Sequence, residues 1–250
     1  MPTLSAIVPC YNKEKVVYAA LSALQAVLRS TGLRYEMVLV NDGSRDSTLQ
    51  ELERFAKKTP QARVVDLKAN LGKGGALMAG FSHSSGDLVL FSDADSDLSP
   101  AQVSRFLDYM ERFRADVVIG SKNHPDSKVR YPFVRRILSH AYLILNFILF
   151  TLPVSDTQVG LKLFRRPVLE YAVPRMLVKK YAYDLELLVL AHHGGFHIKE
   201  APIDLCYQGW SGVVGIPIFW IFWDTMAIWY RLKLVKYYDR HKADVRVVVA

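Results

Sequence analysis

Short apolar runs alternate with longer amphipathic stretches through the first 120 residues of the chain. The apolar runs are rich in β-branched residues and have the length of strands, whereas apolar residues in the longer stretches recur with helical spacing. The expected strands are residues 4–9, 35–41, 62–67, 87–93 and 115–120, and the expected helices are residues 14–29, 47–58, 74–84 and 100–113. Strands that alternate with helices form right-handed crossovers, so the pattern predicts an α/β fold with a mostly parallel, Rossmann-like central sheet.

Small, acidic and amide side chains follow the predicted strands at the ends where an open parallel sheet binds its ligands. They are Pro9, Tyr11 and Asn12 after the first strand, Asn41 and Asp42 after the second, Asp66 after the third, and Asp93, Asp95 and Asp97 after the fourth. The carboxyl ends of parallel strands meet at one edge of a sheet. We therefore expect these side chains to line a polar cleft.

The pattern changes at Ser121, where a polar and basic loop precedes an apolar helical stretch at residues 137–150. Further apolar segments follow at residues 155–166, 181–193 and 196–203. No linker rich in Gly, Ser or Pro separates these segments from the preceding part, which predicts one α/β domain over residues 1–211. An aromatic-rich pattern begins near Gly212 and predicts a C-terminal helical attachment over residues 212–250.

Two apolar stretches are long enough to raise the question of a membrane. Residues 137–150 contain a histidine and an asparagine and are shorter than the roughly 20 apolar residues that a transmembrane helix needs. Residues 213–230 hold Pro217 near their start and Asp224 near their centre. A charge at the bilayer centre costs about 2.5 to 3.5 kcal/mol, so this stretch is not expected to cross a bilayer.

The second stretch has the pattern of a helix that lies in a membrane surface. Its aromatic face comprises Phe219, Trp223, Met226 and Tyr230, and Asp224 and Arg231 share another face. Tryptophans followed by Arg231, Lys233 and Lys236 are typical of a helix in the headgroup region of an anionic leaflet. The alternative is that the aromatic face packs against the domain itself.

Composition and charge narrow the classes of protein. A chain of 250 residues with 51% apolar residues forms a core, which excludes a disordered protein. The net charge of +8 admits nucleic acid, an anionic membrane or phosphate-bearing ligands. Nucleic acid is not expected, because the basic residues are not clustered with stacking aromatic residues.

Cys10 and Cys206 are too few for a disulfide framework, and the first residues lack the pattern of a secretory signal. We therefore expect the protein on the reducing, cytosolic side of the membrane.

Three aspartates at alternate positions end the fourth predicted strand. If the strand continues through them, Asp93 and Asp95 project to the same side. Two carboxylates placed in this way can hold a hard divalent ion such as Mg²⁺ or Mn²⁺, which prefers oxygen ligands and offsets the charge of phosphates. The alternative is a solvated turn before the helix start at Ser99, and Asp97 is either a third ligand or a capping residue.

Two basic features suggest further anion sites. Lys73 lies in "NLGKGGAL", which lacks the spacing of a phosphate loop but places a lysine beside a helix amino terminus. A basic loop precedes the apolar helix at residues 137–150 and contains Lys122, Lys128, Arg130, Arg135 and Arg136. This loop is either a second phosphate site with a hydrocarbon neighbour or a solvated loop before a core helix.

The ordered motifs "IVPCYN", "VNDGSRDST", "NLGKGGAL", "DADSD", "GSKNH", "DTQVGLKLF" and "YDLELL" resemble glycosyltransferase family 2 over about residues 3–210. More narrowly, they resemble the dolichyl- or polyprenyl-phosphate hexose synthases. The resemblance implies a GT-A fold that binds a nucleotide sugar. It also implies inverting transfer of a hexose to a polyprenyl or dolichyl phosphate at the cytoplasmic face of a membrane, by a peripheral or monotopic protein.

The resemblance also implies roles for individual residues. The nucleotide sugar would be bound by Pro9, Tyr11, Asp42 and Asp93, with Asp156, Gln158 and Lys162 around the sugar. Asn12, Asp66 and Lys73 join this set because of their places at strand ends and at a helix start. Asp93, Asp95 and Asp97 would surround Mg²⁺ or Mn²⁺, and Asp95 and Lys122, with Arg135 or Arg136, would form the catalytic and acceptor-phosphate site. The acceptor phosphate is already anionic near neutral pH, because its second pKa is about 6, so no strong general base is needed.

The chain departs from the family pattern at three positions. Lys13 stands where a glutamate is usual, with Glu14 next along the chain, and Lys122 replaces an arginine and loses its bidentate fork. Asp97 replaces the glutamine of the mannose synthases, which favours UDP-glucose over GDP-mannose as donor. Two alternatives stay open: transfer to another lipid or glycan acceptor, and a catalytically silent, membrane-bound nucleotide-sugar sensor.

Overall fold

A computed structural model describes residues 3–94, 99, 101–130, 133–206 and 216–240, and for residues 130, 133–141, 206 and 216–218 it describes the backbone alone. The strands are β1 (Thr3–Cys10), β2 (Arg34–Asp42), β3 (Ala62–Leu67), β4 (Leu88–Phe91), β5 (Val117–Ser121), β6 (Lys128–Arg130), β7 (Lys162–Arg165), β8 (Ile198–Pro202) and β9 (Asp204–Cys206). The helices are α1 (Val17–Ser30), α2 (Thr48–Lys58), α3 (Gly72–Ser82), α4 (Gln102–Arg112), α5 (Phe133–Phe150), α6 (Arg166–Ala172), α7 (Tyr183–His193), α8 (Ile216–Trp229) and α9 (Tyr237–Arg240). A 3₁₀ turn, η1 (Val173–Arg175), follows α6, and a short π-helical segment, η2 (Tyr230–Leu234), follows α8.

The central sheet has seven strands in the order β3-β2-β1-β4-β7-β5-β8. Neighbouring strands run parallel except at β7, which is antiparallel to both β4 and β5. A separate two-stranded parallel sheet pairs β6 with β9. The predicted α/β fold with a mostly parallel sheet is therefore confirmed.

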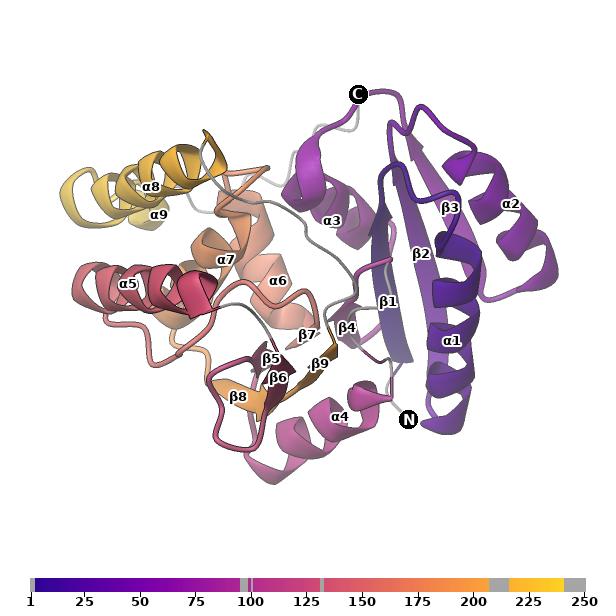
Figure 1. Ribbon diagram of the computed structural model, residues 1–250, viewed down its shortest axis with the longest axis horizontal. Helices are drawn as coiled ribbons and strands as arrows, with labels where there is room; N and C mark the ends of the chain where they lie inside the picture. The colour runs from indigo at the N-terminus through magenta and orange to yellow at the C-terminus, as the bar shows by residue number, and fades with distance from the viewer. Residues whose placement is uncertain (1–2, 95–98, 100, 131–132, 207–215, 241–250) are drawn as a thin grey trace.

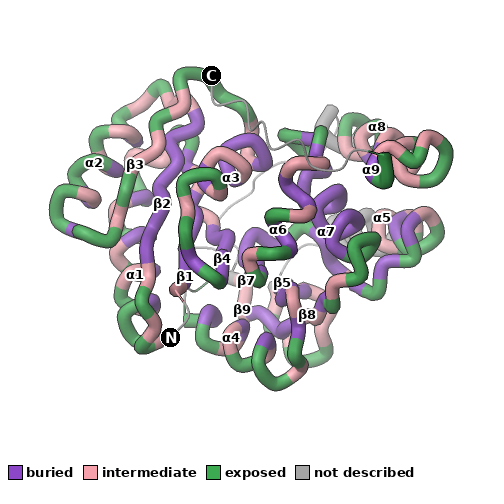
Figure 2. The backbone as a smooth tube through the Cα atoms, turned by 180° about the vertical axis from the view of Figure 1, so that it is seen from behind, coloured by how far each residue is buried: buried purple, intermediate pink, exposed green. Residues whose placement is uncertain are grey.

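Helices cover both faces of this sheet. Apolar side chains of α1, α2 and α4 pack on one face, and those of α3, α6 and α7 pack on the other. Figure 1 shows α1 and α2 on one side of β1 and β2, with α3 on the opposite side. Figure 2 shows that buried residues concentrate in β2, β1, β4 and α7, which places the core along the sheet and beneath the helix layers.

A buried carboxylate ties together the strands at the amino-terminal edge of the sheet. Glu36 of β2 accepts hydrogen bonds from Ser5 Oγ of β1 at 2.7 Å and from the backbone N–H of Ser85, before β4, at 2.6 Å. Its second oxygen accepts from Arg63 of β3 at 2.6 Å. Burial acts to raise the pKa of Glu36, but these hydrogen bonds and the charge of Arg63 outweigh it and lower that pKa. The ionised carboxylate of β2 thus links β1, β3 and the segment that precedes β4.

The C-terminal helices pack beside α5 and α7. Tyr142 of α5 and Thr225 of α8 join their hydroxyl groups at 3.1 Å, and Ile228 of α8 is fully buried. In the described part of the chain, none of the helices combines the length and hydropathy that a membrane span requires. The expected boundary between residues 211 and 212 lies outside the described residues, so the two-part division stays a prediction.

Candidate functional site

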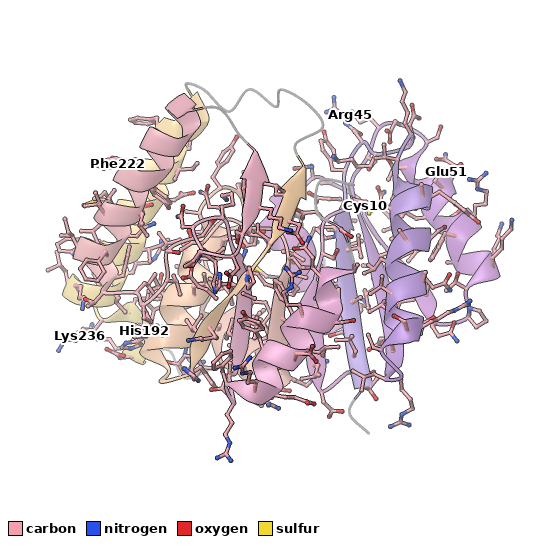
Figure 3. All side chains as sticks on the ribbon, turned by 60° about the horizontal axis from the view of Figure 1, so that its bottom comes forward. Cys10, Arg45, Glu51, His192, Phe222 and Lys236 are labelled. Carbon is pink, nitrogen blue, oxygen red and sulfur yellow. The ribbon has the colours of Figure 1, made fainter. Side chains whose placement is uncertain are left out.

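A cleft of about 490 Å³ opens at the carboxyl ends of β1, β2 and β4. It is lined by Pro9, Cys10, Tyr11, Lys13, Asp42, Asn70, Gly72, Lys73, Asp93, Ala94, Lys180 and Tyr181. The structure therefore brings together five of the predicted nucleotide-binding residues, namely Pro9, Tyr11, Asp42, Lys73 and Asp93. In Figure 3, Cys10 marks the end of β1 beside this cleft. Cys10 is itself buried, and burial raises the pKa of its thiol to about 12. The thiol is therefore uncharged at neutral pH and forms part of the cleft wall.

Asp42 ends β2 and holds the start of α3 in place. Its Oδ1 accepts a hydrogen bond from the backbone N–H of Leu71 at 2.7 Å, and Gly72 also donates to it. Burial raises the pKa of Asp42, against the effect of these donors and of the Lys180 charge. Gly43 follows with φ 63°, and a Cβ there would meet the Ala69 backbone at 2.7 Å. The tight turn therefore requires glycine and fixes Asp42 at the mouth of the cleft.

Asp93 lies just beyond β4, within reach of several lysines. Its Oδ1 forms an ion pair with Lys73 Nζ, and Lys162 and Lys13 also act on its charge. Burial acts to raise the pKa of Asp93, but these three positive charges prevail and hold that pKa below its usual 3.8. Asp93 is therefore ionised at neutral pH, and the surrounding cations make the cleft attractive to a phosphate-bearing ligand.

Gly160 gives Asp93 the space it occupies. A Cβ at position 160 would overlap Asp93 Oδ2. Gly160 belongs to the loop before β7, so this antiparallel strand and its loop set one side of the Asp93 pocket. The motif "QVGLKLF" thus shapes the site through the absence of a side chain.

The chemistry of Asp93 fits a divalent metal ion. Its ionised carboxylate, only 25% exposed, lies at the ligand-binding end of a parallel strand and offers the oxygen donors that Mg²⁺ and Mn²⁺ prefer. Within the described ranges, no three His, Cys, Asp or Glu side chains are grouped so that they could hold a metal ion. The other two predicted ligands, Asp95 and Asp97, lie outside the described residues, and the predicted metal site stays a prediction.

Two predicted nucleotide-binding residues lie beside the cleft and do not line it. Asn12 adopts φ 51° and uses its side-chain oxygen to accept from the backbone N–H of Arg45 at 2.9 Å. Asp66 of β3 accepts from Asn41 Nδ2 at 2.8 Å and from Lys68 Nζ at 2.9 Å. Both side chains support neighbouring loops and strands, and a direct contact with a ligand stays a prediction for them.

A second charged cluster follows β5. Lys122 Nζ forms an ion pair with Asp156 Oδ2 at 2.9 Å, and the Lys122 backbone N–H donates to the same oxygen at 3.1 Å. Lys122 is 21% exposed and Asp156 is 7% exposed. Gln158 is exposed two residues further on, where its backbone N–H donates to Asp156 Oδ1 at 3.0 Å. The side chains of Arg135 and Arg136 lie outside the described residues.

Lys162, expected beside the sugar, lies within the protein core. Its Nζ donates to Asp184 Oδ1 at 2.5 Å and to the Val159 carbonyl at 2.6 Å, and its side chain is 1% exposed. Burial lowers the pKa of Lys162, partly offset by Asp184. In this arrangement Lys162 acts on the cleft through its charge on Asp93, and a direct sugar contact stays a prediction.

Seven lining residues are outside the predicted nucleotide-binding set, namely Cys10, Lys13, Asn70, Gly72, Ala94, Lys180 and Tyr181. Lys13 stands out in the sequence only as a departure from the family pattern. Its neighbour Glu14 accepts from the backbone N–H of Ser47 at 2.9 Å and so serves the start of α2. Lys180 and Tyr181 come from a loop far along the chain. No local pattern places that loop at the cleft.

A larger groove of about 730 Å³ lies at the amino-terminal edge of β4, near Asp87. Its two arginines are already engaged, because Arg165 donates to the Ala115 carbonyl at 3.2 Å and Arg166 donates to the Gly86 carbonyl at 2.6 Å. The smaller cleft, by contrast, gathers several lysines around two carboxylates. It is therefore the candidate active site.

Comparison with known proteins gives matches over most of the chain. A family model described as glycosyl transferase family 2 matches residues 5–172. A dolichyl-phosphate β-glucosyltransferase of Trichomonas vaginalis is 30% identical over 212 residues, which cover 79% of this chain and 62% of that protein. One of Saccharomyces cerevisiae is 30% identical over 219 residues, which cover 80% of this chain and 66% of that protein. The chain thus spans less than two thirds of the length of these two relatives.

A solved structure matches the fold. Glucosyl-3-phosphoglycerate synthase from Mycobacterium tuberculosis, in complex with Mn²⁺, uridine diphosphate and glucosyl-3-phosphoglycerate, superposes with a TM-score of 0.67. It is 18% identical, and the match covers 92% of this chain and 79% of that one. At this identity the similarity shows the fold alone.

Proposed function

Because the chain belongs to glycosyl transferase family 2 and has the GT-A fold, we propose that it transfers a hexose from a nucleotide sugar to dolichyl or polyprenyl phosphate. UDP-glucose is the favoured donor, and glucose is the hexose transferred. The named activity of the relatives, which are dolichyl-phosphate β-glucosyltransferases, supports this choice. The observation that carries the proposal is the cleft in which Lys13, Lys73 and Lys180 surround Asp42 and Asp93.

The cleft has the charges that a nucleotide diphosphate requires. Lysines on three separate segments can bind the diphosphate oxygens, and Asp42 can accept hydrogen bonds from the nucleoside. Mg²⁺ or Mn²⁺, held by Asp93 and Asp95, would neutralise the departing diphosphate. The solved structure with Mn²⁺ and uridine diphosphate supports this part of the proposal for a related fold.

The acceptor phosphate enters from the side of the basic loop. Lys122, with Arg135 and Arg136, binds the phosphate, and the ion pair with Asp156 fixes the position of the Lys122 side chain. The phosphate is an anionic nucleophile at neutral pH, so positioning and charge neutralisation do most of the catalysis. A phosphate oxygen attacks the anomeric carbon from the face opposite the diphosphate, which forms one C–O bond, breaks the other and inverts the configuration.

The decisive experiment is a donor screen with a short polyprenyl phosphate. Radiolabelled UDP-glucose and GDP-mannose are supplied with Mg²⁺ or Mn²⁺, and the organic-extractable, mild-acid-labile product is counted. We expect label from UDP-glucose in that fraction, with the configuration at the anomeric carbon read by NMR. Label in a lipid that resists mild acid, in a glycan, or nowhere would contradict the proposal.

The proposed site of action is the cytoplasmic surface of a membrane. Exposed apolar side chains occur on two adjacent helices, with Ile144, Phe147 and Ile148 on α5 and Phe219, Trp220, Phe222 and Trp223 on α8. Figure 3 shows Phe222 and Lys236 on the outer side of the molecule, opposite Glu51. An apolar surface of this kind beside lysines supports binding to an anionic leaflet, as predicted.

Changing this surface tests membrane binding directly. The double substitution Phe222→Ser and Trp223→Ser is expected to weaken binding to liposomes containing anionic lipid by about a hundredfold or more, since burying each aromatic side chain in the leaflet contributes about 1.5 kcal/mol or more. Liposome flotation measures the effect. Val16→Ser, which changes an exposed apolar residue beside α1, serves as the control and should float like the wild type. Equal flotation of the wild type and both variants would contradict membrane binding through this apolar surface.

A further inference from the structure

The loop at residues 176–182, between η1 and α7, forms one wall of the donor cleft. Lys180 and Tyr181 line the cleft from this loop, and both side chains are exposed, Tyr181 by 45%. The Lys180 charge acts on Asp42 across the cleft. A loop with exposed side chains holds a fixed position only where its backbone is fixed, so its hydrogen bonds decide where Lys180 and Tyr181 lie.

On the cleft side, the loop is bonded to the glycine-rich start of α3. The Lys179 carbonyl accepts from the backbone N–H of Gly75 at 3.2 Å. A Cβ on Gly74 would meet the same carbonyl at 2.8 Å, which shows how closely the two segments approach. This contact fixes the middle of the loop.

Both ends of the loop are held by carboxylates. Near its start, Glu186 Oε2 of α7 accepts from the backbone N–H of Leu177 at 2.9 Å and of Val178 at 2.7 Å. At its end, the backbone N–H of Ala182 faces Asp224 of α8 and acts to lower the pKa of that carboxyl group, against the effect of burial. Two amide groups of this short loop therefore donate to Glu186 of α7, and a third faces Asp224 of α8.

The C-terminal segment also completes the Glu186 site. Glu186 is fully buried, and its Oε1 accepts from Tyr238 Oη at 2.5 Å and from Arg231 at 3.0 Å. Arg231 Nε donates to Tyr238 Oη at 2.9 Å. A buried carboxyl group costs free energy unless its oxygens have hydrogen-bond partners, so η2 and α9 support the residue that holds the loop.

We propose that Asp224 and Glu186 are positioning residues that hold Lys180 and Tyr181 at the cleft, so that the docked C-terminal segment sets the affinity for the donor nucleotide. This inference rests on the proposed function for the identity of the donor. A loop that is ordered before the ligand arrives loses less conformational entropy on binding, and a loop released at one end binds more weakly. The C-terminal segment thereby acts on the donor site without touching the donor.

The test compares Asp224→Ala with Asp224→Asn in the full chain. The alanine removes the acceptor for the Ala182 amide, whereas asparagine keeps a carbonyl oxygen there. With UDP and Mg²⁺ in a calorimetric titration, we expect Asp224→Ala to raise Kd by about fivefold to tenfold, the effect of one lost hydrogen bond, and Asp224→Asn to stay near the wild type. Lys180→Ala and Tyr181→Ala should raise Kd in the same way.

Hydrogen exchange supplies a second readout that does not depend on the nucleotide. Asp224→Ala should speed exchange of amides in residues 176–182 and leave those of β1 and β2 unchanged. Asp126→Ala is the control, because it removes a carboxylate that is 77% exposed, lies before β6, and belongs neither to the loop nor to the C-terminal segment. It should leave both readouts unchanged.

The outcomes separate this inference from the proposed function. Wild-type Kd and wild-type exchange in Asp224→Ala would overturn the inference, and so would equal weakening by Asp224→Ala and Asp224→Asn. A wild type that binds UDP but labels no polyprenyl phosphate would overturn the acceptor assignment and leave the positioning role standing. Glu186→Gln is a second route should Asp224→Ala fail to fold, with the same two readouts and the same expected directions.

Discussion

Replacing Asp93 with asparagine is expected to lower kcat for hexose transfer by about a thousandfold or more, since removing a charged group that serves the transition state commonly has such an effect. The substitution keeps the size of the side chain that Gly160 accommodates. It removes the negative charge that faces Lys73 and would hold the metal ion. Initial rates with saturating UDP-glucose and polyprenyl phosphate measure the loss.

The matched control lies at the other end of the same strand. Asp87 precedes β4, is exposed, and accepts a hydrogen bond from the Thr3 backbone N–H at 2.9 Å. Asp87→Asn makes the same chemical change away from the cleft and should keep wild-type kcat. If Asp93→Asn retained more than about a tenth of the wild-type rate, the stabilisation assigned to Asp93 would be under about 1.4 kcal/mol, too small for a metal ligand.

Lys162→Met is expected to lower the free energy of unfolding by about 3 to 5 kcal/mol, the usual effect of removing one partner from a buried ion pair. The Lys162 side chain is 1% exposed and Asp184 is 9% exposed, so Asp184 would be left charged without its close partner. Urea denaturation followed by circular dichroism measures the change. The double variant Lys162→Met, Asp184→Leu should recover most of the loss, because it leaves no unpaired buried charge.

A surface ion pair provides the comparison. Lys68 and Asp66 pair at 2.9 Å, but Lys68 is 90% exposed. Lys68→Met should leave the unfolding midpoint close to that of the wild type, since solvent screens such pairs. A Lys162→Met protein as stable as Lys68→Met would show that the buried pair contributes no more than a surface one.

The periodicity of the sequence predicted the alternating half of the fold because local rules govern it. Strands β1 to β5 fall within or next to their expected ranges, and parallel pairing then brings Pro9, Asp42 and Asp93 to one edge. Helix α1 begins at Val17 instead of residue 14, because the preceding loop is bonded to the start of α2 through Glu14 and Ser47. Such a contact between distant segments has no signature in the local pattern.

The remaining part of the site depends on long-range packing. Lys162 has the sequence context of a ligand-binding residue, but its strand β7 inserts between β4 and β5 and turns the side chain toward Asp184. Lys180 reaches the cleft because hydrogen bonds to α3 and α7 position its loop. Neither outcome follows from spacing or composition, because each is decided by which distant segments share a face.

The position of β7 in the sheet also sets an order of events during synthesis. Strands β1 to β4 pair with one another and need only residues up to 91, so this half of the sheet can form while the ribosome is still making the rest. Strand β5 has no neighbour among those four and must wait until its first neighbour, β7, has been made. In the interval, its apolar residues 117–119 and the edge of β4 are both uncovered. The newly made chain is therefore most exposed to misassociation and most in need of a chaperone between the synthesis of residue 121 and that of residue 165.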